Sequence, residues 1–290
     1  LTLSFPENQS IEIINQTQVN TFLQTFICEN RDQKERITSA AESLGISLRE
    51  RYYIITAHIQ EELNSSKNTA SILKKRSLTH FFQHIYLERD ILGGFDQNNN
   101  LLFWVPIDHA VEEDVSNFYI QVDWIARLLH DQFHTLDIQF AGSTSTDHLD
   151  GLAQKYREAL TALTFARANG LGASHYTQTG LFGLLSQLDY ETQIFPFYRR
   201  YLGKILSLGQ MEAEELLQTL YMYALSGFNS RECARRIYLH HNSVRYRLNR
   251  IQKLTNLSLS KPDDLVCLLA CLIIIKDYDR PELGQLRKAV

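Results

Sequence analysis

A segment of 28 residues near the carboxyl end gathers the side chains best suited to binding a polyanion. Between Asn229 and Asn256 lie seven Lys or Arg and one acid, a local charge of +6, so the rest of this chain of net charge −4 carries −10. Concentrated positive charge of this kind attracts nucleic-acid phosphates. From charge alone, a solvated basic helix face remains the alternative.

The spacing within this segment predicts a helix that reads DNA. Val244, Leu248 and Ile251 recur at i, i+4 and i+7, which indicates a buried stripe on a helix at about 242–254. The opposite side and its flanks are polar, and Arg and Asn can bond guanine and adenine in the major groove. We expect contacts to bases and nearby groups from His241, Asn242, Ser243, Arg245, Tyr246, Arg247, Asn249 and Arg250. We expect phosphate contacts from Arg231, Arg235, Arg236 and Lys253.

Two preceding helices are expected to position this one. Residues 211–226 form an amphipathic pattern with acids Glu212, Glu214 and Glu215 at its start, where the helix dipole favours them. A second, short helix at 230–238 places the small Ala234 where two crossing helices approach closely. Three helices with a tight turn before the last predict a helix-turn-helix at about 211–256.

The residues of this segment carry a family resemblance. The run Ala234-(x)4-Leu239-(x)-His241-Asn242-Ser243-Val244-(x)-Tyr246-Arg247-Leu248-(x)2-Ile251 resembles the C-terminal helix-turn-helix of PucR/CdaR-type bacterial transcription regulators, which is similar to that of Fis. The chain has His241 where Arg is usual and Ser243 where Thr is usual. Both keep hydrogen-bonding capacity, so the resemblance still implies DNA binding and leaves the base preference in question.

The resemblance extends upstream. Residues of about 50–168, ending in a stretch with the core Tyr156-Arg157-Glu158-Ala159-Leu160, look like the GGDEF-like domain of those regulators. Active diguanylate cyclases carry Gly-Gly-acid-acid-Phe in a hairpin turn that binds metal and nucleotide. Here the turn is Asp96–Asn100, and Gly93-Gly94-Phe95-Asp96 precedes it without consecutive acids. We therefore expect a domain without catalytic activity.

The expected fold class is α+β. Strand patterns at 52–57, 91–92, 101–107 and 136–141 alternate with helical patterns in the order βαββαβ, typical of nucleotide-cyclase-like sheets. No strand pattern is found after Gly170. We expect a helical N-terminal segment at 1–48, a GGDEF-like α/β domain at 49–169 and a helical domain at 170–290.

Composition excludes several protein classes. With 290 residues, 44% hydrophobic, 21% charged and only 13 Gly and 5 Pro, the chain is neither collagen-like nor disordered. Its longest apolar run, Leu265–Ile275, is too short for a membrane span of about 20 residues and fits a buried helix. Four scattered cysteines indicate a reducing compartment, so a cytoplasmic protein without membrane contact is expected.

Other chemical motifs are weak. His80-(x)3-His84 and His130-(x)3-His134 have the spacing of a zinc-binding helix but lack a well-placed glutamate, and Cys267-(x)3-Cys271 lies in an apolar helix. No phosphate-binding or nucleophile-elbow motif is present. We expect no catalytic residue, no metal and no cofactor.

Three hypotheses follow. The first is a transcription regulator that binds double-stranded DNA as a homodimer and responds to an unidentified small-molecule effector; the resemblance implies an activator of catabolic genes. The second is a cyclase-like nucleotide-binding or enzymatic domain with an incidental basic helix. The third is an adaptor that acts only through protein contacts.

Overall fold

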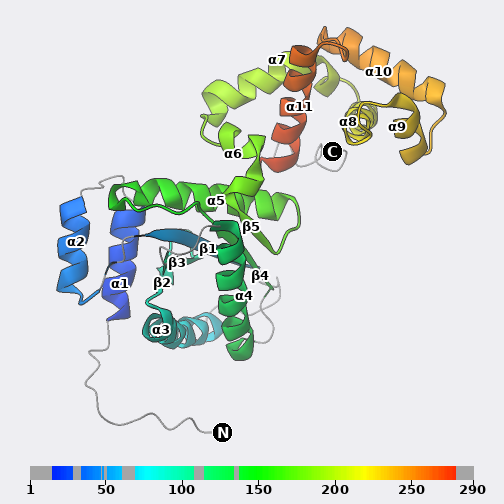
Figure 1. The fold of residues 1–290 in the computed structure, drawn as a ribbon. Coiled ribbons are helices and arrows are strands. Elements are labelled where there is room, and N and C mark those ends of the chain that lie inside the picture. Colours follow the sequence, from blue (N-terminus) through cyan, green and yellow to red (C-terminus); the bar gives the residue numbers. More distant parts are fainter. Residues whose placement is uncertain are drawn as a thin grey trace. The chain divides into compact units, whose positions relative to one another are not determined.

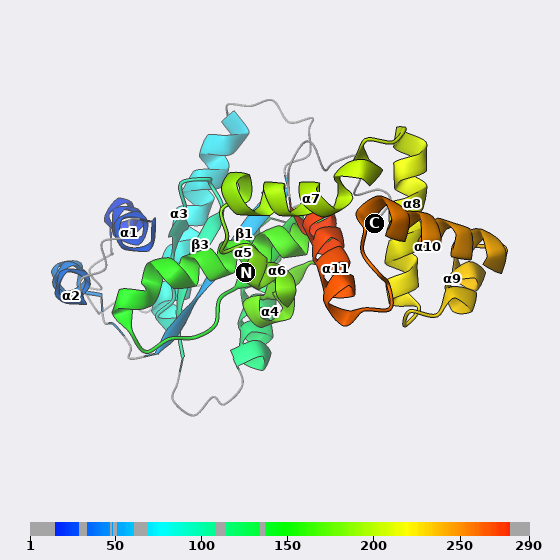
Figure 2. The same ribbon diagram turned by 90° about the horizontal axis from the view of Figure 1, so that it is seen from above.

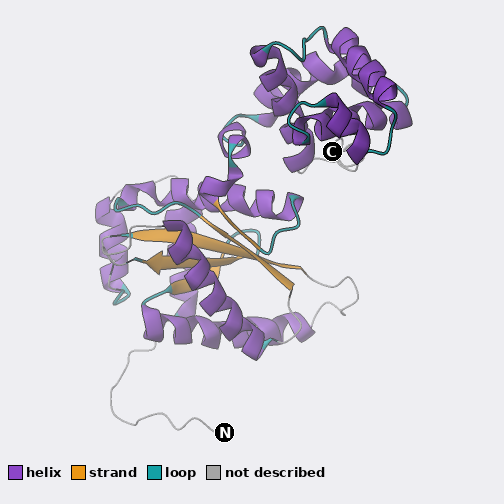
Figure 3. Ribbon diagram, turned by 45° about the vertical axis from the view of Figure 1, so that its right-hand side comes forward, coloured by secondary structure: helices purple, strands orange, loops and turns teal. Residues whose placement is uncertain are grey.

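The chain divides into two compact units. The computed structural model describes residues 15–28, 34–46, 48, 51–60, 69–107, 114–133 and 137–278. Unit 1 comprises Leu1–Leu163 and Gly172–Thr177, and unit 2 comprises Thr164–Leu171 and Gln178–Val290. Figure 1 shows both units, and Figure 3 shows that the strands lie in unit 1.

A five-stranded sheet forms the centre of unit 1. Its order is β2-β3-β1-β4-β5, antiparallel except for the parallel pair β4 and β5. The strands are β1 (Tyr52–Gln60), β2 (Leu92–Phe95), β3 (Leu101–Pro106), β4 (Asp137–Gly142) and β5 (Ala173–His175). The helices of the unit are α1 (Gln16–Leu23), α2 (Lys34–Ser43), α3 (Thr69–Arg89), α4 (Asp114–Gln132) and α5 (Leu152–Ala168).

Helices cover both faces of the sheet, with α5 on one side and α3 on the other (Figure 1). Tyr53 and Ile55 of β1 face a core shared with α3 and α4, whereas Tyr52 and Ile54 face one shared with α1, α2 and α5. Alternate residues of a strand point to opposite faces, so burial on both sides explains the continuous apolar run at the start of β1.

The predicted βαββαβ order is confirmed, with one strand missed. The expectation that strands end before Gly170 is wrong, because β5 pairs with β4 through Ala173, Ser174 and His175. Three residues without an alternating apolar pattern give too short a signal to detect. The expected hairpin turn between β2 and β3 is present, with Asn99 at a positive φ of 59°.

The N-terminal helices pack against the sheet and share its core. A π-helical turn, Gln24–Cys28, continues α1. Three amide side chains of this helical stretch bond the backbone of the edge strand β2: Gln16 donates to Gly93 O at 2.7 Å, Gln24 donates to Phe95 O at 3.1 Å, and Asn20 accepts from Phe95 N at 3.3 Å. These bonds occupy backbone N–H and C=O groups of β2 that could otherwise pair with another strand.

Unit 2 is helical in its described part. It contains the end of α5, then α6 (Leu181–Leu185), α7 (Phe195–Leu206), α8 (Gln210–Leu225), α9 (Ser230–Arg236), α10 (His241–Thr255) and α11 (Pro262–Asp277). One apolar core joins α7 to α11, including Leu217, Val244 and Cys271. In neither unit is a described helix both long and apolar enough to cross a bilayer.

Gly93→Ala should destabilise unit 1. A Cβ atom at Gly93 would lie 2.2 Å from Cδ1 of the buried Phe82, so a core ring must shift, at a cost of about 1–3 kcal/mol. Gly172 lies in the same unit with no atom within 4 Å of an added Cβ, so Gly172→Ala is the matched control. Urea unfolding of both variants checks the prediction, and equal stabilities would contradict it.

Candidate nucleic-acid interface

Helices α8, α9 and α10 pack together as a helix-turn-helix (Figures 1 and 2). Val244, Leu248 and Ile251 of α10 are buried, as the apolar stripe predicts. Cys233 and Ala234 of α9 are buried in the same core. This core determines which side of α10 faces outward.

The end of α9 forms a Schellman motif with an unusual residue. The Leu239 N–H donates to Ala234 O at 3.0 Å and the Tyr238 N–H to Arg235 O at 3.4 Å, with Tyr238 at a φ of 55°. A side chain at this left-handed position is strained, and glycine is usual there. The same motif ends α2, α5 and α8, where Gly45, Gly170 and Gly227 occupy the position.

The start of α10 is fixed by two histidines. His240 is the N-cap residue, and its Nδ1 accepts a hydrogen bond from the Asn242 N–H at 3.2 Å. His241 Nε2 lies 3.0 Å from the hydroxyl of Ser230 at the start of α9. The His241–Ser230 contact therefore holds the start of α9 against the start of α10. His241, predicted to contact DNA, is therefore half-buried and tied to the scaffold.

The outward face of α10 is polar and exposed. Its exposed residues are Asn242, Ser243, Arg245, Tyr246, Asn249 and Lys253. The Tyr246 side chain is 65% exposed. Arg245 and Lys253 have no ion-pair partner among the residues that the structure describes. All six are among the predicted contact residues.

Two predicted contact residues lie on the side of α10 that faces α8. Arg247 Nη2 is 2.7 Å from Glu215 Oε2, and its Nη1 donates to Thr219 Oγ1 at 3.3 Å. The Arg250 guanidinium forms an ion pair with Glu212. Neither acid was predicted to face α10, because a helix pattern gives the face of a residue but not its neighbour on another helix.

The predicted phosphate contacts on α9 differ in their surroundings. Glu232 binds both Arg235, at 2.7 Å, and Arg236, at 3.1 Å. Hydrogen bonds from Arg235 and then Arg236 hold the pKa of Glu232 below its ordinary value. Arg236 also donates to Leu225 O at 3.2 Å and so caps the end of α8. Arg231 is exposed and has no ion pair within the described part of the chain.

Two cysteines of unit 2, Cys233 and Cys271, are buried. Burial raises the pKa of the Cys233 thiol, and burial together with the nearby Cys267 raises that of Cys271 to about 12. Such thiols stay protonated and unreactive at neutral pH. No group of three His, Cys, Asp or Glu side chains among the described residues is arranged to hold a metal, and His134 lies outside those residues.

The hairpin of unit 1 has no space beside its glycines. Added Cβ atoms at Gly93 and Gly94 would meet Phe82 at 2.2 Å and Asn20 at 2.4 Å. Asp96, which follows them, is buried and accepts four hydrogen bonds of 2.8 Å. The donors are the backbone N–H groups of Asn98 and Asn100, the Asn100 amide and the Tyr156 hydroxyl. The Asp96 carboxylate is thus bonded within the fold.

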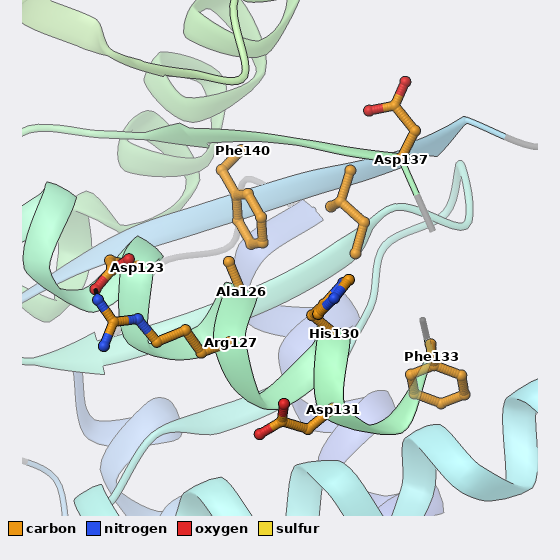
Figure 4. A pocket seen from close by; sticks show the side chains of 9 residues that line it. Asp123, Ala126, Arg127, His130, Asp131, Phe133, Asp137 and Phe140 are labelled. Atoms are coloured by element: carbon orange, nitrogen blue, oxygen red, sulfur yellow. Dashed lines mark ion pairs between the residues drawn. The ribbon is translucent and has the colours of Figure 1, made fainter. Parts of the chain in front are cut away.

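Unit 1 also has a pocket of about 430 Å³ between α4 and β4 (Figure 4). Its walls include apolar Ala126, Ile138 and Phe140, and the exposed Asp123–Arg127 ion pair of 2.7 Å lies at one side. The sequence pattern did not indicate this pocket, because helix and strand periodicity does not show how two consecutive elements pack against each other.

Tyr238→Gly should stabilise unit 2 by about 0.5–1 kcal/mol, because removing Cβ relieves left-handed strain that exceeds the added entropy of the unfolded glycine. Tyr238 is 95% exposed, so its ring loses no packing. Tyr238→Ala keeps Cβ and serves as the control. Thermal unfolding measures both, and a stabilisation by alanine equal to that by glycine would show that backbone strain is not the cause.

Comparisons with known proteins agree with this architecture. Residues 29–165 match the GGDEF-like domain, and residues 216–274 match the PucR C-terminal helix-turn-helix domain. The chain is 25% identical over 117 residues to the proline-responsive transcriptional activator PutR of Bacillus subtilis, covering 39% of this chain and 28% of that protein. It is 17% identical over 248 residues to the DNA-binding transcriptional activator AdeR of the same species, covering 84% of this chain and 56% of that protein.

The matched parts thus span about a quarter of PutR and little more than half of AdeR. A solved regulator of polyketide synthase expression from Bifidobacterium adolescentis aligns with 89% of this chain and 92% of its own at 17% identity and a TM-score of 0.37, too low for a conclusion about the fold. The two domain matches account for most of the chain in the order that the structure shows. The chain therefore carries the two domains of PucR-type transcription regulators, a GGDEF-like domain followed by the PucR C-terminal helix-turn-helix.

Proposed function

We propose that this chain binds duplex DNA by inserting α10 into the major groove. The observation that carries the proposal is the outward face of α10, where Asn242, Arg245, Tyr246 and Asn249 are exposed together on a helix whose opposite side is buried. Exposed Arg and Asn side chains on one helix face can form the paired hydrogen bonds that distinguish bases. Residues near the start of the helix reach deepest.

The cations flanking this face suit the phosphate backbone. Arg231 and Lys253 are exposed without ion pairs among the described residues, so their full charge is available to DNA. Arg235 is exposed but forms an ion pair with Glu232, and Arg236 caps the end of α8. We therefore assign phosphate binding chiefly to Arg231 and Lys253. Arg236 is assigned a structural role.

The GGDEF-like domain is proposed to be non-enzymatic. The filled space beside Gly93 and Gly94 and the fully bonded Asp96 support this assignment, because neither the glycines nor the carboxylate is accessible to a nucleotide or metal. A cyclase-like activity would require the packing beside the two glycines to open and the Asp96 carboxylate to lose its present hydrogen bonds. This proposal agrees with the two relatives, both of which are named as transcriptional activators.

The regulatory role, the oligomeric state and the effector are proposed from the relatives and from general principles of DNA recognition. Both named relatives are activators, so we propose activation of transcription in the cytoplasm. A single helix-turn-helix rarely supplies enough specific affinity, which favours a homodimer on paired half-sites. PutR is named as proline-responsive, which favours a small-molecule effector here without identifying it. An adaptor function would leave the exposed face of α10 without a role.

Titration of the full chain with labelled duplex DNA should show an affinity that falls steeply with salt. The slope of log K against log salt should be about −0.9 for each phosphate neutralised. Arg127→Ala, which removes a cation from α4 in unit 1, should change neither affinity nor slope. A slope near zero for the unchanged chain would contradict DNA binding.

Asn249→Ala and Arg231→Ala should have different effects on base preference. Once the preferred sites have been selected from genomic fragments, Asn249→Ala should cost about 1–3 kcal/mol at those sites and relax the preference at one base pair. Arg231→Ala should weaken binding to all sequences alike and reduce the slope of log K against log salt by about 1. Selection and titration with both variants measure these changes. Identical effects of the two variants would contradict the assignment of Asn249 to bases and Arg231 to phosphates.

A further inference from the structure

Two arginines on one side of α10 are held by carboxylates of α8, and their surroundings differ. The Arg247 side chain is only 20% exposed, and besides Glu215 it bonds the hydroxyl of the fully buried Thr219. Thr219 in turn donates to the Glu215 carbonyl at 2.7 Å. Arg247 is therefore part of the packed α8–α10 contact.

The second pair is more accessible. The side chains of Arg250 and Glu212 are 37% and 39% exposed, and the structure gives neither a further hydrogen bond. Both line a pocket that also includes Asn242, Ser243 and Tyr246 from the outward side of α10. The pair is thus solvent-accessible and borders the surface proposed to contact DNA.

We propose that Arg250 exchanges Glu212 for a DNA phosphate when the duplex binds, so that Glu212 limits the affinity of the free protein for any DNA. This inference rests on the proposed function. Duplex DNA carries one negative charge per about 1.7 Å of axis, so a guanidinium at the flank of an inserted helix meets several phosphates. A half-exposed ion pair is worth little in water and can be replaced at low cost.

The exchange would make Glu212 a determinant of the overall affinity for DNA. Its carboxylate competes with phosphate for Arg250 on every sequence, so it weakens binding to all duplexes. Base recognition by Asn242, Arg245 and Asn249 does not depend on it. Glu212 therefore lowers the affinity for specific and non-specific sites alike and leaves the ratio between them unchanged.

The test is a set of variants of the full chain titrated with a labelled mixed-sequence duplex at several salt concentrations. Glu212→Gln should bind about two- to fivefold more tightly than the matched control Glu214→Gln. Glu214 lies on the same helix and loses the same charge, but its carboxylate accepts from Gln210 at 2.9 Å and not from an arginine of α10.

The role of Arg250 is tested in the same titration. Arg250→Gln should reduce the salt slope by about 0.9, since one phosphate contact is lost. In the Arg250→Gln background, Glu212→Gln should have no more effect than Glu214→Gln. Thermal unfolding of each variant verifies that the fold is intact.

The outcomes separate the exchange from the proposed function. Equal affinities of Glu212→Gln and Glu214→Gln, weaker binding by Glu212→Gln, or an unchanged slope for Arg250→Gln would each overturn the exchange while DNA binding stands. Absence of salt-dependent binding by the unchanged chain would overturn both proposals.

Discussion

The burial of one side of α10 is the constraint on which the proposed interface depends. Val244, Leu248 and Ile251 are removed from water in the core of unit 2, and each fully buried aliphatic side chain contributes about 1.5–3 kcal/mol. A rotation of α10 about its axis would expose these residues and bury polar ones. The orientation of the polar face is therefore set by the hydrophobic core, independently of any contact with DNA.

Electrostatic contacts then divide the cations of the segment into two groups. Arg236, Arg247 and Arg250 are bound to groups of α8, whereas Arg231 and Arg245 extend into solvent without ion pairs in the described chain. A local charge of +6 thus overstates the charge immediately available to a ligand. The acids that balance it come largely from α8, outside the basic segment.

Much of this arrangement could be predicted from the sequence, and the rest depended on contacts between distant residues. The three helices and the buried stripe follow from local periodicity, because a period of 3.6 residues places Val244 and Leu248 on one side. The βαββαβ order was predictable for the same reason. Local patterns cannot show that Glu215 reaches Arg247 or that Asn20 fills the space beside Gly94, since each pair joins separate elements. The three-residue strand β5 is too short for a periodic pattern, and the left-handed Tyr238 occupies a position where glycine is the usual indicator.

The two edges of the sheet have a consequence for how copies of this chain can assemble. At one edge, the amides of Gln16, Asn20 and Gln24 occupy backbone groups of β2; at the other, β5 offers only three residues. An incoming strand would have to displace α1 or attach to a ladder too short to hold it. Growth of the sheet into fibres or into a continuous intersubunit sheet is thus disfavoured from both sides, which favours helical surfaces of the described residues for self-association.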